Sequence, residues 1–298
     1  MNLNTIWNSL VEGFYPLGNS EMEKTANELG VGDGWITWLW ASWLFASEPF
    51  STASFMRIRP YGSARVIEAR FAEAARQGIL SVHSEGEYQR AEKGKQVVDQ
   101  IVQSAEEVIA HLQPIPPAEL QKILNYTKRL VEATLDTPEP PSRFAILRYH
   151  KNIHIEQDMP LLRLLLHHVG SLDQYRGAAH IASWEAYNIK GYEWSAFTSI
   201  WRKEADPLDA LHEEMGSSVF TREEILEALQ NLSARGWITE TAGNYQVTTE
   251  GANVRQEAED VTDRLFFVPW SCLNESELEE LSHLAEQLRD GLKNLEGK

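Results

Sequence analysis

One short pattern of residues occurs twice in this chain, once in each half. The segments ARQGILSVHSEGEYQRAEKGKQVV and SARGWITETAGNYQVTTEGANVR share a glycine, a tyrosine and a second glycine in the same order, at Gly78, Tyr88 and Gly94 and at Gly236, Tyr245 and Gly251. The first glycine and the tyrosine are 10 residues apart in one segment and 9 in the other, and the tyrosine and the second glycine are 6 apart in both. Such self-similarity indicates an internal duplication.

The residues around the first copy predict helices, then a hairpin, then a longer helix. We expect helices over 34–47, 52–56 and 63–77, two strands joined near Gly86, and a helix over 94–111. Apolar residues at three- and four-residue spacing favour the helix over 63–77, and Gly78 stands where a left-handed cap ends it. Three helices, a hairpin and a helix are the order of a winged helix.

The second copy predicts the same order of elements. We expect helices over 194–203, 208–215 and 221–235, a hairpin over 237–247, and a long helix that Gly251 precedes and Pro269 breaks. Thr221 caps the third of these helices, and Glu224 completes a capping box with it. The chain is therefore expected to be mainly α, with two winged-helix modules.

The remaining segments are also expected to be helical. Helices over 118–135 and 159–186, the second with a break near Gly170, fill the region between the modules. The predicted domains are residues 1–33 (N-terminal helices), 34–112 (first module), 113–190 (helical middle region), 191–270 (second module) and 271–298 (an acidic helix).

Charge and cysteine content narrow the class of protein. The net charge of −17 argues against a chain covered by nucleic acid, but residues 57–95 hold eight Lys and Arg against five Asp and Glu. The single cysteine, Cys272, excludes an intramolecular disulfide. The most apolar run, 35–45, is too short to span a bilayer. We expect a cytoplasmic protein with no membrane contact.

The second copy resembles winged-helix proteins of the MarR type. The family pattern of a helix ending, a β-wing and a Thr-x-x-Gly helix start falls on Leu232, Gly236, Trp237, Ile238, Tyr245, Val247, Thr248 and Gly251. The first copy, over 67–94, is similar but looser, with Arg90 where the pattern has threonine. The tandem arrangement departs from the single-module, dimeric layout of the family.

The resemblance implies DNA binding through the third helix and the wing of a module. In the first module the implied DNA-binding residues are Arg57, Arg59, Ser63, Arg65, Arg70, Arg90 and Lys93. The corresponding helix of the second module carries Arg222, Glu223, Glu224 and Glu227, and carboxylates are poor partners for phosphate. We expect a transcription regulator that contacts duplex DNA mainly through the first module.

One alternative function is that of a protein adaptor. An adaptor would use the winged helices to pack on partner proteins. This function is favoured if the arginines of the first module pair with Glu68, Glu73 and Glu92 rather than share one exposed face.

The oligomeric state also stays open. A homodimer through the acidic helix over 275–295 fits the resemblance, as does a monomer whose modules act as a pseudo-dimer.

The middle region offers a candidate ligand pocket. Tyr175, Arg176, His180 and Trp184 lie within three turns of one predicted helix, with Tyr187 and Tyr192 nearby. An apolar pocket with a few polar groups could hold a small-molecule effector, although helix packing explains such aromatic residues more often.

Five histidines in the middle region raise a metal-dependent enzyme as a further alternative. They are His150, His154, His167, His168 and His180, near Glu156, Asp158, Asp173 and Glu185. The sequence has no HExxH pattern, Walker loop, GxGxxG or GxSxG motif. We therefore expect no enzyme and no cofactor, and surface or capping roles for the histidines. Cys272 is expected to be a small buried residue or, near a helix start, a thiol with a lowered pKa.

Overall fold

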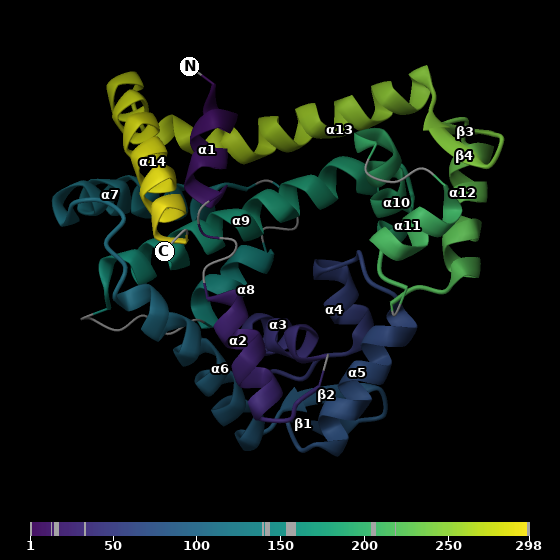
Figure 1. Cartoon of the computed structure of the whole chain (residues 1–298), viewed down its shortest axis with the longest axis horizontal. Helices are drawn as coiled ribbons and strands as arrows, with labels where there is room; N and C mark the ends of the chain where they lie inside the picture. Colours follow the sequence, from purple (N-terminus) through teal and green to yellow (C-terminus); the bar gives the residue numbers. More distant parts are fainter. Residues whose placement is uncertain are drawn as a thin grey trace.

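The chain is built mainly from α-helices, as its sequence predicts (Figure 1). The computed structural model describes residues 2–12, 14, 18–32, 34–138, 140, 144–152, 159–203, 207–217 and 219–296. Within these ranges there are fourteen α-helices, one short 3-10 helix and two separate β-hairpins. The buried apolar side chains form three cores, which divide the chain into two similar units and a helical middle.

The first unit, called unit 1 here, surrounds the first copy of the repeat. Its elements are α2 (Asn19–Glu28), α3 (Trp35–Phe45), α4 (Thr52–Ile58), α5 (Ala64–Arg76), β1 (Leu80–Ser84), β2 (Glu87–Arg90) and α6 (Glu92–Ala110). Ser51 caps α4 and forms a capping box with Ser54. Phe71 of α5 meets Phe50 and Phe55 edge to face in the core, so these aromatic rings fix α5 on the unit.

The second unit, unit 2, repeats this order around the second copy. Its elements are α10 (Gly191–Arg202), α11 (Leu208–Glu214), α12 (Arg222–Ala234), β3 (Ile238–Thr241), β4 (Asn244–Val247) and α13 (Thr249–Phe267). The predicted capping box of Thr221 and Glu224 is confirmed at the start of α12. Trp194, Phe197 and Trp237 occupy the centre of its core.

The two units agree element by element. Helices α4 and α11 have 7 residues each, α5 and α12 have 13, and α6 and α13 have 19. Equivalent backbone hydrogen bonds join the helix to the hairpin, from Ile79 N to Ala74 O at 2.9 Å and from Trp237 N to Leu232 O at 3.1 Å. The repeat in the sequence thus corresponds to a repeat in backbone geometry.

A glycine recurs near the start of the long helix in both units, and the close packing around it explains why. A Cβ atom on Gly94 would lie 2.0 Å from the carbonyl oxygen of Ile79, and one on Gly251 would lie 2.1 Å from that of Trp237. Both glycines lie inside their helices, so the prediction that Gly251 precedes α13 is wrong, because this helix begins at Thr249. No side chain fits where the helix backbone crosses the first strand.

The helical middle joins the two units. It consists of α1 (Leu3–Glu12), α7 (Pro117–Asp136), α8 (Phe144–Asn152), α9 (Leu161–Glu185), the 3-10 helix η1 (Val268–Cys272) and α14 (Glu275–Glu296). Helices α9 and α13 pack side by side and run from the middle into unit 2, while unit 1 lies below them in Figure 1. The predicted N-terminal pair is shared between two cores, since α1 packs in the middle and α2 in unit 1.

Helix α9 is continuous, so the predicted break near Gly170 is wrong. A Cβ atom on Gly170 would lie 2.6 Å from the hydroxyl oxygen of Tyr149. The glycine therefore accommodates a tyrosine from α8 that packs directly on the helix backbone, and it does not end the helix.

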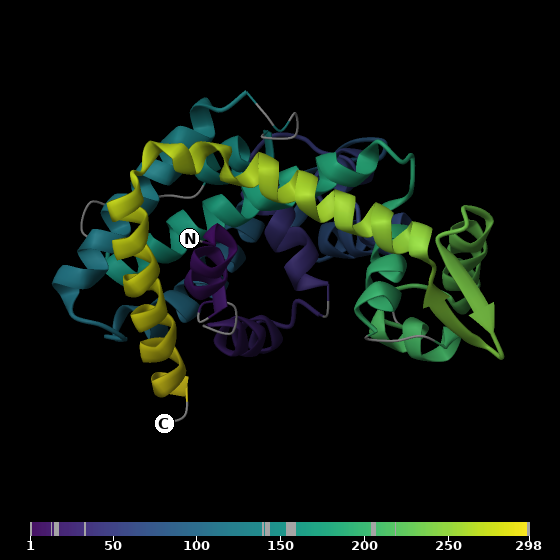
Figure 2. The ribbon, with the colours of Figure 1, turned by 90° about the horizontal axis from the view of Figure 1, so that it is seen from above.

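The acidic helix α14 packs within the chain, beside α1 (Figure 2). Its apolar residues enter the core of the middle. Its carboxylates Glu277 and Glu280 pair with Arg129 and Lys122 of α7 at 2.5 and 2.6 Å. A homodimer through α14 would have to use the outer face of this helix.

Gly94→Ala is expected to lower the free energy of unfolding by about 1–3 kcal/mol, because the new methyl group overlaps the Ile79 carbonyl. Gly177→Ala is the matched control, because nothing lies within 4 Å of its Cβ position in α9. That change should raise the free energy of unfolding by about 0.5–1 kcal/mol. Urea denaturation of both variants checks the pair, and equal effects would contradict the close crossing.

Candidate nucleic-acid surface and central cleft

The outer edge of α5 carries two exposed arginines. Arg65 and Arg76 have side chains that are 62% and 73% exposed. Arg65 was among the residues predicted for DNA binding, whereas Arg76 was missed, although it lies on the same helix. Arg76 pairs with Glu73 one turn before it. Surface pairs of this kind are weak, so they leave the arginine available to a phosphate.

The N-terminal ends of α5 and α12 meet. Ser63, which precedes α5, donates a hydrogen bond from Oγ to Glu224 Oε1 at 3.3 Å. Arg65 Nη2 lies 3.7 Å from Glu224 Oε2. Glu224 also accepts a hydrogen bond from the backbone N–H of Thr221 in the capping box. One carboxylate of unit 2 therefore caps its own helix and contacts the start of the corresponding helix of unit 1.

The other predicted DNA-binding residues lie in different surroundings from Arg65. Arg70 donates to Thr37 Oγ1 at 3.1 Å, and Lys93 donates to the carbonyl of Gln77 at 2.8 Å. Arg59 stacks on Trp40 with its guanidinium carbon 3.9 Å from the ring centre. Arg57 lines a cavity with Arg59, and Arg90 lies half-buried in β2.

Among the described residues, the pairing that would favour an adaptor is limited to Arg76 with Glu73. Glu68 accepts hydrogen bonds from Tyr88 and Thr52 rather than from an arginine. The basic residues of unit 1 are thus divided between the exposed edge of α5, the cleft and other parts of the surface.

The equivalent edge of α12 has the opposite character. With the two 13-residue helices aligned, Glu223 stands at the position of Arg65 and Ala234 at that of Arg76. Arg222 is the one arginine of α12, and it pairs with Asp209 at 2.8 Å. The two units therefore share a backbone but differ in the charge that this helix presents.

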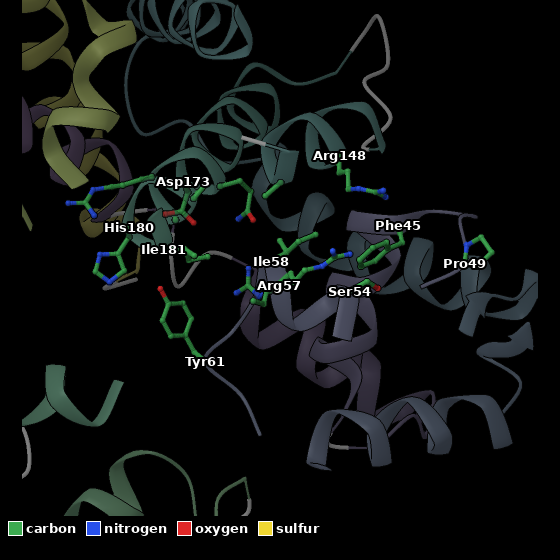
Figure 3. Close-up of a pocket in the computed structure, with 16 residues that line it drawn as sticks. Phe45, Pro49, Ser54, Arg57, Ile58, Tyr61, Arg148, Asp173, His180 and Ile181 are labelled. Carbon is green, nitrogen blue, oxygen red and sulfur yellow. The ribbon is translucent and has the colours of Figure 1, made fainter. Parts of the chain in front are cut away.

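A cleft lies where α4 and the turn after it face α9 (Figure 3). A cavity of about 720 Å³ extends from Phe45 and Arg148 at one end to Tyr61, Asp173 and His180 at the other. A second cavity of about 610 Å³ continues from there toward α1, α10 and α13. The two cavities share four lining residues, which are Tyr61, Asp173, Arg176 and His180.

Two of the four predicted ligand residues line this cleft. Arg176 and His180, one turn apart on α9, line both cavities. Tyr175 lies on another face of the helix, where its hydroxyl donates to the carbonyl of Leu265 at 3.3 Å. Trp184 is buried and donates from Nε1 to the Tyr61 hydroxyl at 3.2 Å. The spacing of Arg176 and His180 in the sequence predicted that they lie one turn apart on a helix. It could not predict which face of α9 meets unit 1.

His180 is held neutral in the cleft. Its Nε2 accepts a hydrogen bond from Trp194 Nε1 at 3.2 Å, so the ring proton is on Nδ1, which lies 3.3 Å from Thr262 Oγ1. Burial and the nearby Arg255 lower the pKa of His180 to about 4. His180 therefore serves as a fixed polar wall of the cleft at neutral pH.

Several lining residues had no functional prediction in the sequence. Burial raises the pKa of the Tyr61 hydroxyl to about 12. Arg255 is 1% exposed, lies between Trp194 and Trp201, and pairs with Glu259 at 2.5 Å. Its position could have been found, because it falls in a buried stripe of α13 formed by residues 251, 255, 258 and 262. Tyr61 carries no comparable local signal, since it lies in a turn.

The comparisons with known proteins place this geometry in a family. A model of a helix-turn-helix family matches residues 96–294, about two thirds of the chain. The chain belongs to this helix-turn-helix family. Searches of curated proteins and of solved structures found no match. Because helix-turn-helix motifs bind DNA, membership indicates a DNA-binding protein.

The matched segment includes the middle and unit 2. Helices α11 and α12 lie within it, whereas α4 and α5 precede it. Among the described helices, none combines the length and the apolar run that a membrane span requires.

Three histidines of the middle region cluster together, with His167 and His168 buried and His150 half-buried. His167 Nε2 lies 3.3 Å from His150 Nδ1, and His168 Nδ1 lies 3.0 Å from Thr127 Oγ1. Burial lowers the pKa of His167 to about 3 and that of His168 to about 4. His154, Glu156 and Asp158 lie outside the described residues. Within those residues no group of three or more His, Cys, Asp and Glu side chains has a geometry suited to a metal ion.

Cys272 is half-buried in η1. Burial raises the pKa of its thiol. The expectation of a lowered pKa is therefore wrong, because the loss of water around the sulfur outweighs the nearby Arg129.

Acid is expected to destabilise the chain through the buried histidines. His167 and His168 titrate near 6.5 when unfolded and near 3 and 4 when folded, so unfolding takes up protons between these values. The free energy of unfolding should fall as pH decreases below about 6.5, by up to about 1.4 kcal/mol per pH unit for each histidine. Urea denaturation between about pH 7 and pH 5 measures this slope.

The double variant His167→Gln/His168→Gln should show a shallower slope, whatever its stability at neutral pH. His83→Gln, an exposed position in β1, is the control and should leave the slope unchanged. An unchanged slope in the double variant would show that other groups take up the protons.

Proposed function

We propose that this protein is a cytoplasmic, DNA-binding transcription regulator built from two winged-helix units in tandem. Membership of a helix-turn-helix family is the observation that carries the proposal. The matching hairpins and helix lengths of the two units, together with the glycine crossings at Gly94 and Gly251, support winged helices of the MarR type in both halves. We assign the chain no catalytic residue.

Unit 1 is the unit proposed to contact duplex DNA. The exposed edge of α5 presents Arg65 and Arg76, where α12 presents Glu223 and Ala234. Arginine at such an edge can bind phosphate or a guanine, whereas glutamate is repelled by the DNA backbone. We leave Arg57 and Arg59 out of this proposed role because both line the cleft.

The contact between α5 and α12 restricts how DNA can approach. Glu224 occupies the N-terminal end of α5, which is the part of a recognition helix that enters the major groove. Two such helices that touch at their N-terminal ends cannot lie in successive major grooves, which are one helical turn of about 34 Å apart. We propose that DNA binding requires this contact to open.

A ligand in the cleft is proposed to modulate that opening. The cleft lies between the turn after α4 in unit 1 and helix α9, which continues into unit 2. A molecule that binds one relative position of the units better than another shifts the balance between the positions. We therefore propose that the small-molecule effector binds at Arg176 and His180 rather than at Tyr175 and Trp184.

The adaptor is the second candidate function. Glu223 and Glu227 are exposed on α12, so this edge of unit 2 suits a basic partner protein better than DNA. It becomes the leading function if DNA binding is not observed.

Arg65→Ala is expected to weaken binding to random-sequence duplex DNA and to reduce the slope of log K against log salt by about 0.9, because one phosphate contact is lost. The measurement is fluorescence anisotropy from about 50 to 200 mM salt. Arg222→Ala is the matched control, since it removes the arginine of α12, and it should change neither the affinity nor the slope. If the unaltered protein does not bind at low salt, DNA binding by the isolated chain is wrong.

Glu224→Gln is expected to tighten DNA binding by a few fold. Glutamine can replace glutamate in a capping box, so α12 keeps its N-terminal cap while Arg65 loses its ion pair. The same anisotropy titration measures the change. Glu223→Gln, also on α12 but without a described contact to unit 1, separates release of the contact from a general gain of positive charge. Equal gains for both variants would contradict the proposed opening.

A further inference from the structure

The two adjoining cavities between the units form one cleft of the size of a small-molecule site. Their volumes are about 720 and 610 Å³. Each volume lies within the range of about 300–1,000 Å³ that is usual for such sites. The walls come from unit 1, from α1, α8 and α9 of the middle, and from α10 and α13 of unit 2.

The first cavity is positively charged in a strongly acidic protein. Arg57, Arg59, Arg148 and Arg176 line it, and Asp173 is the one carboxylate among the described lining residues, whereas the whole chain has a net charge of −17. Glu48 pairs with Arg148 and Asp263 pairs with Arg176. Even with these two carboxylates counted, positive charge is in excess, and cleft walls of low polarity concentrate its field.

Three of these arginines have capacity to bind an anion. Arg57 makes no ion pair or hydrogen bond with any residue that the structure describes, although it lines the cavity. The Nε atom of Arg176 is buried and has no hydrogen-bond partner within the described residues. Burial lowers the pKa of Arg59, whose guanidinium lies against the Trp40 ring. A carboxylate or phosphate group matches the geometry of guanidinium donors.

Apolar side chains line the same cavity beside the arginines. Phe45, Ile58 and Ile181 contribute to its walls, with Phe45 at the end away from His180 (Figure 3). A bare inorganic ion would leave these side chains in contact with water, whereas an organic molecule would cover them.

We propose that the cleft binds a small organic anion, with its carboxylate or phosphate group held by Arg57, Arg59 and Arg176 and its apolar body against Phe45, Ile58 and Ile181. This assignment names the chemical class of the effector and rests on the proposed function of the same cleft. Such a molecule touches unit 1 and α9 together, and therefore fixes their relative position.

The test is a titration of the full chain, without DNA, with phenylacetate, phenylphosphate, inorganic phosphate and the neutral 2-phenylethanol. Tryptophan fluorescence and the melting temperature are the readouts, since Trp194 lines the cleft. At least one aromatic anion should bind saturably below a concentration on the order of 10 mM. The neutral alcohol and inorganic phosphate should each bind at least about tenfold more weakly. The tighter of the two aromatic anions identifies the acidic group.

Arg57→Gln should weaken binding of that anion about tenfold, because a charged hydrogen-bond donor is lost. Arg57→Lys, which keeps the charge, should recover part of the affinity. Arg76→Gln removes an exposed arginine outside the cleft and should have no effect. The melting temperatures of the free variants should match that of the unaltered chain, because Arg57 is exposed.

The proposal is overturned if no aromatic anion binds, if the neutral alcohol or inorganic phosphate binds as tightly, or if Arg57→Gln and Arg76→Gln behave alike. Because the titration contains no DNA, its failure leaves the DNA-binding experiments intact. Equally, a chain that fails to bind DNA can still bind the anion.

Discussion

A line of polar contacts between α9 and α13 fixes the frame of the molecule. Arg176 pairs with Asp263 at 3.3 Å, Tyr175 donates to the carbonyl of Leu265, and His180 Nδ1 lies against Thr262. Buried polar groups are costly when unpaired, so a shift of one helix along the other would break several contacts together. The register of these two helices therefore sets the position of unit 2 relative to the middle.

Unit 1 packs on the middle, with α3 against α8 and α6 against α9, and it also meets the start of unit 2. A Cβ atom on Gly191 would lie 2.4 Å from the carbonyl oxygen of Pro60, so the start of α10 lies directly against the turn after α4. Tyr61 accepts a hydrogen bond from Trp184 at the same place. The cleft and the contact between α5 and α12 both depend on how unit 1 sits here. The proposed ligand in the cleft and the proposed DNA contact at α5 would therefore be coupled through one rigid-body adjustment.

The two units show which parts of a repeat are constrained by packing and which are free to change. Gly94 and Gly251 occupy equivalent positions because the crossing of helix and strand leaves no room for a side chain. The exposed edges of α5 and α12 have no such restriction, and they carry arginine in one unit and glutamate in the other. This difference in charge is the reason that unit 1 is the proposed DNA-binding unit.

The sequence by itself determined the mainly helical class, the order of helices and hairpins in both copies, and the capping box at Thr221. These features depend on neighbouring residues, through periodicity, helix caps and glycines with positive φ. Only the tertiary structure decided that α9 continues through Gly170, that Arg57 and Arg59 line a cleft, and that Glu224 meets Arg65. These outcomes depend on which helix faces pack together, and residues far apart in the sequence set that choice.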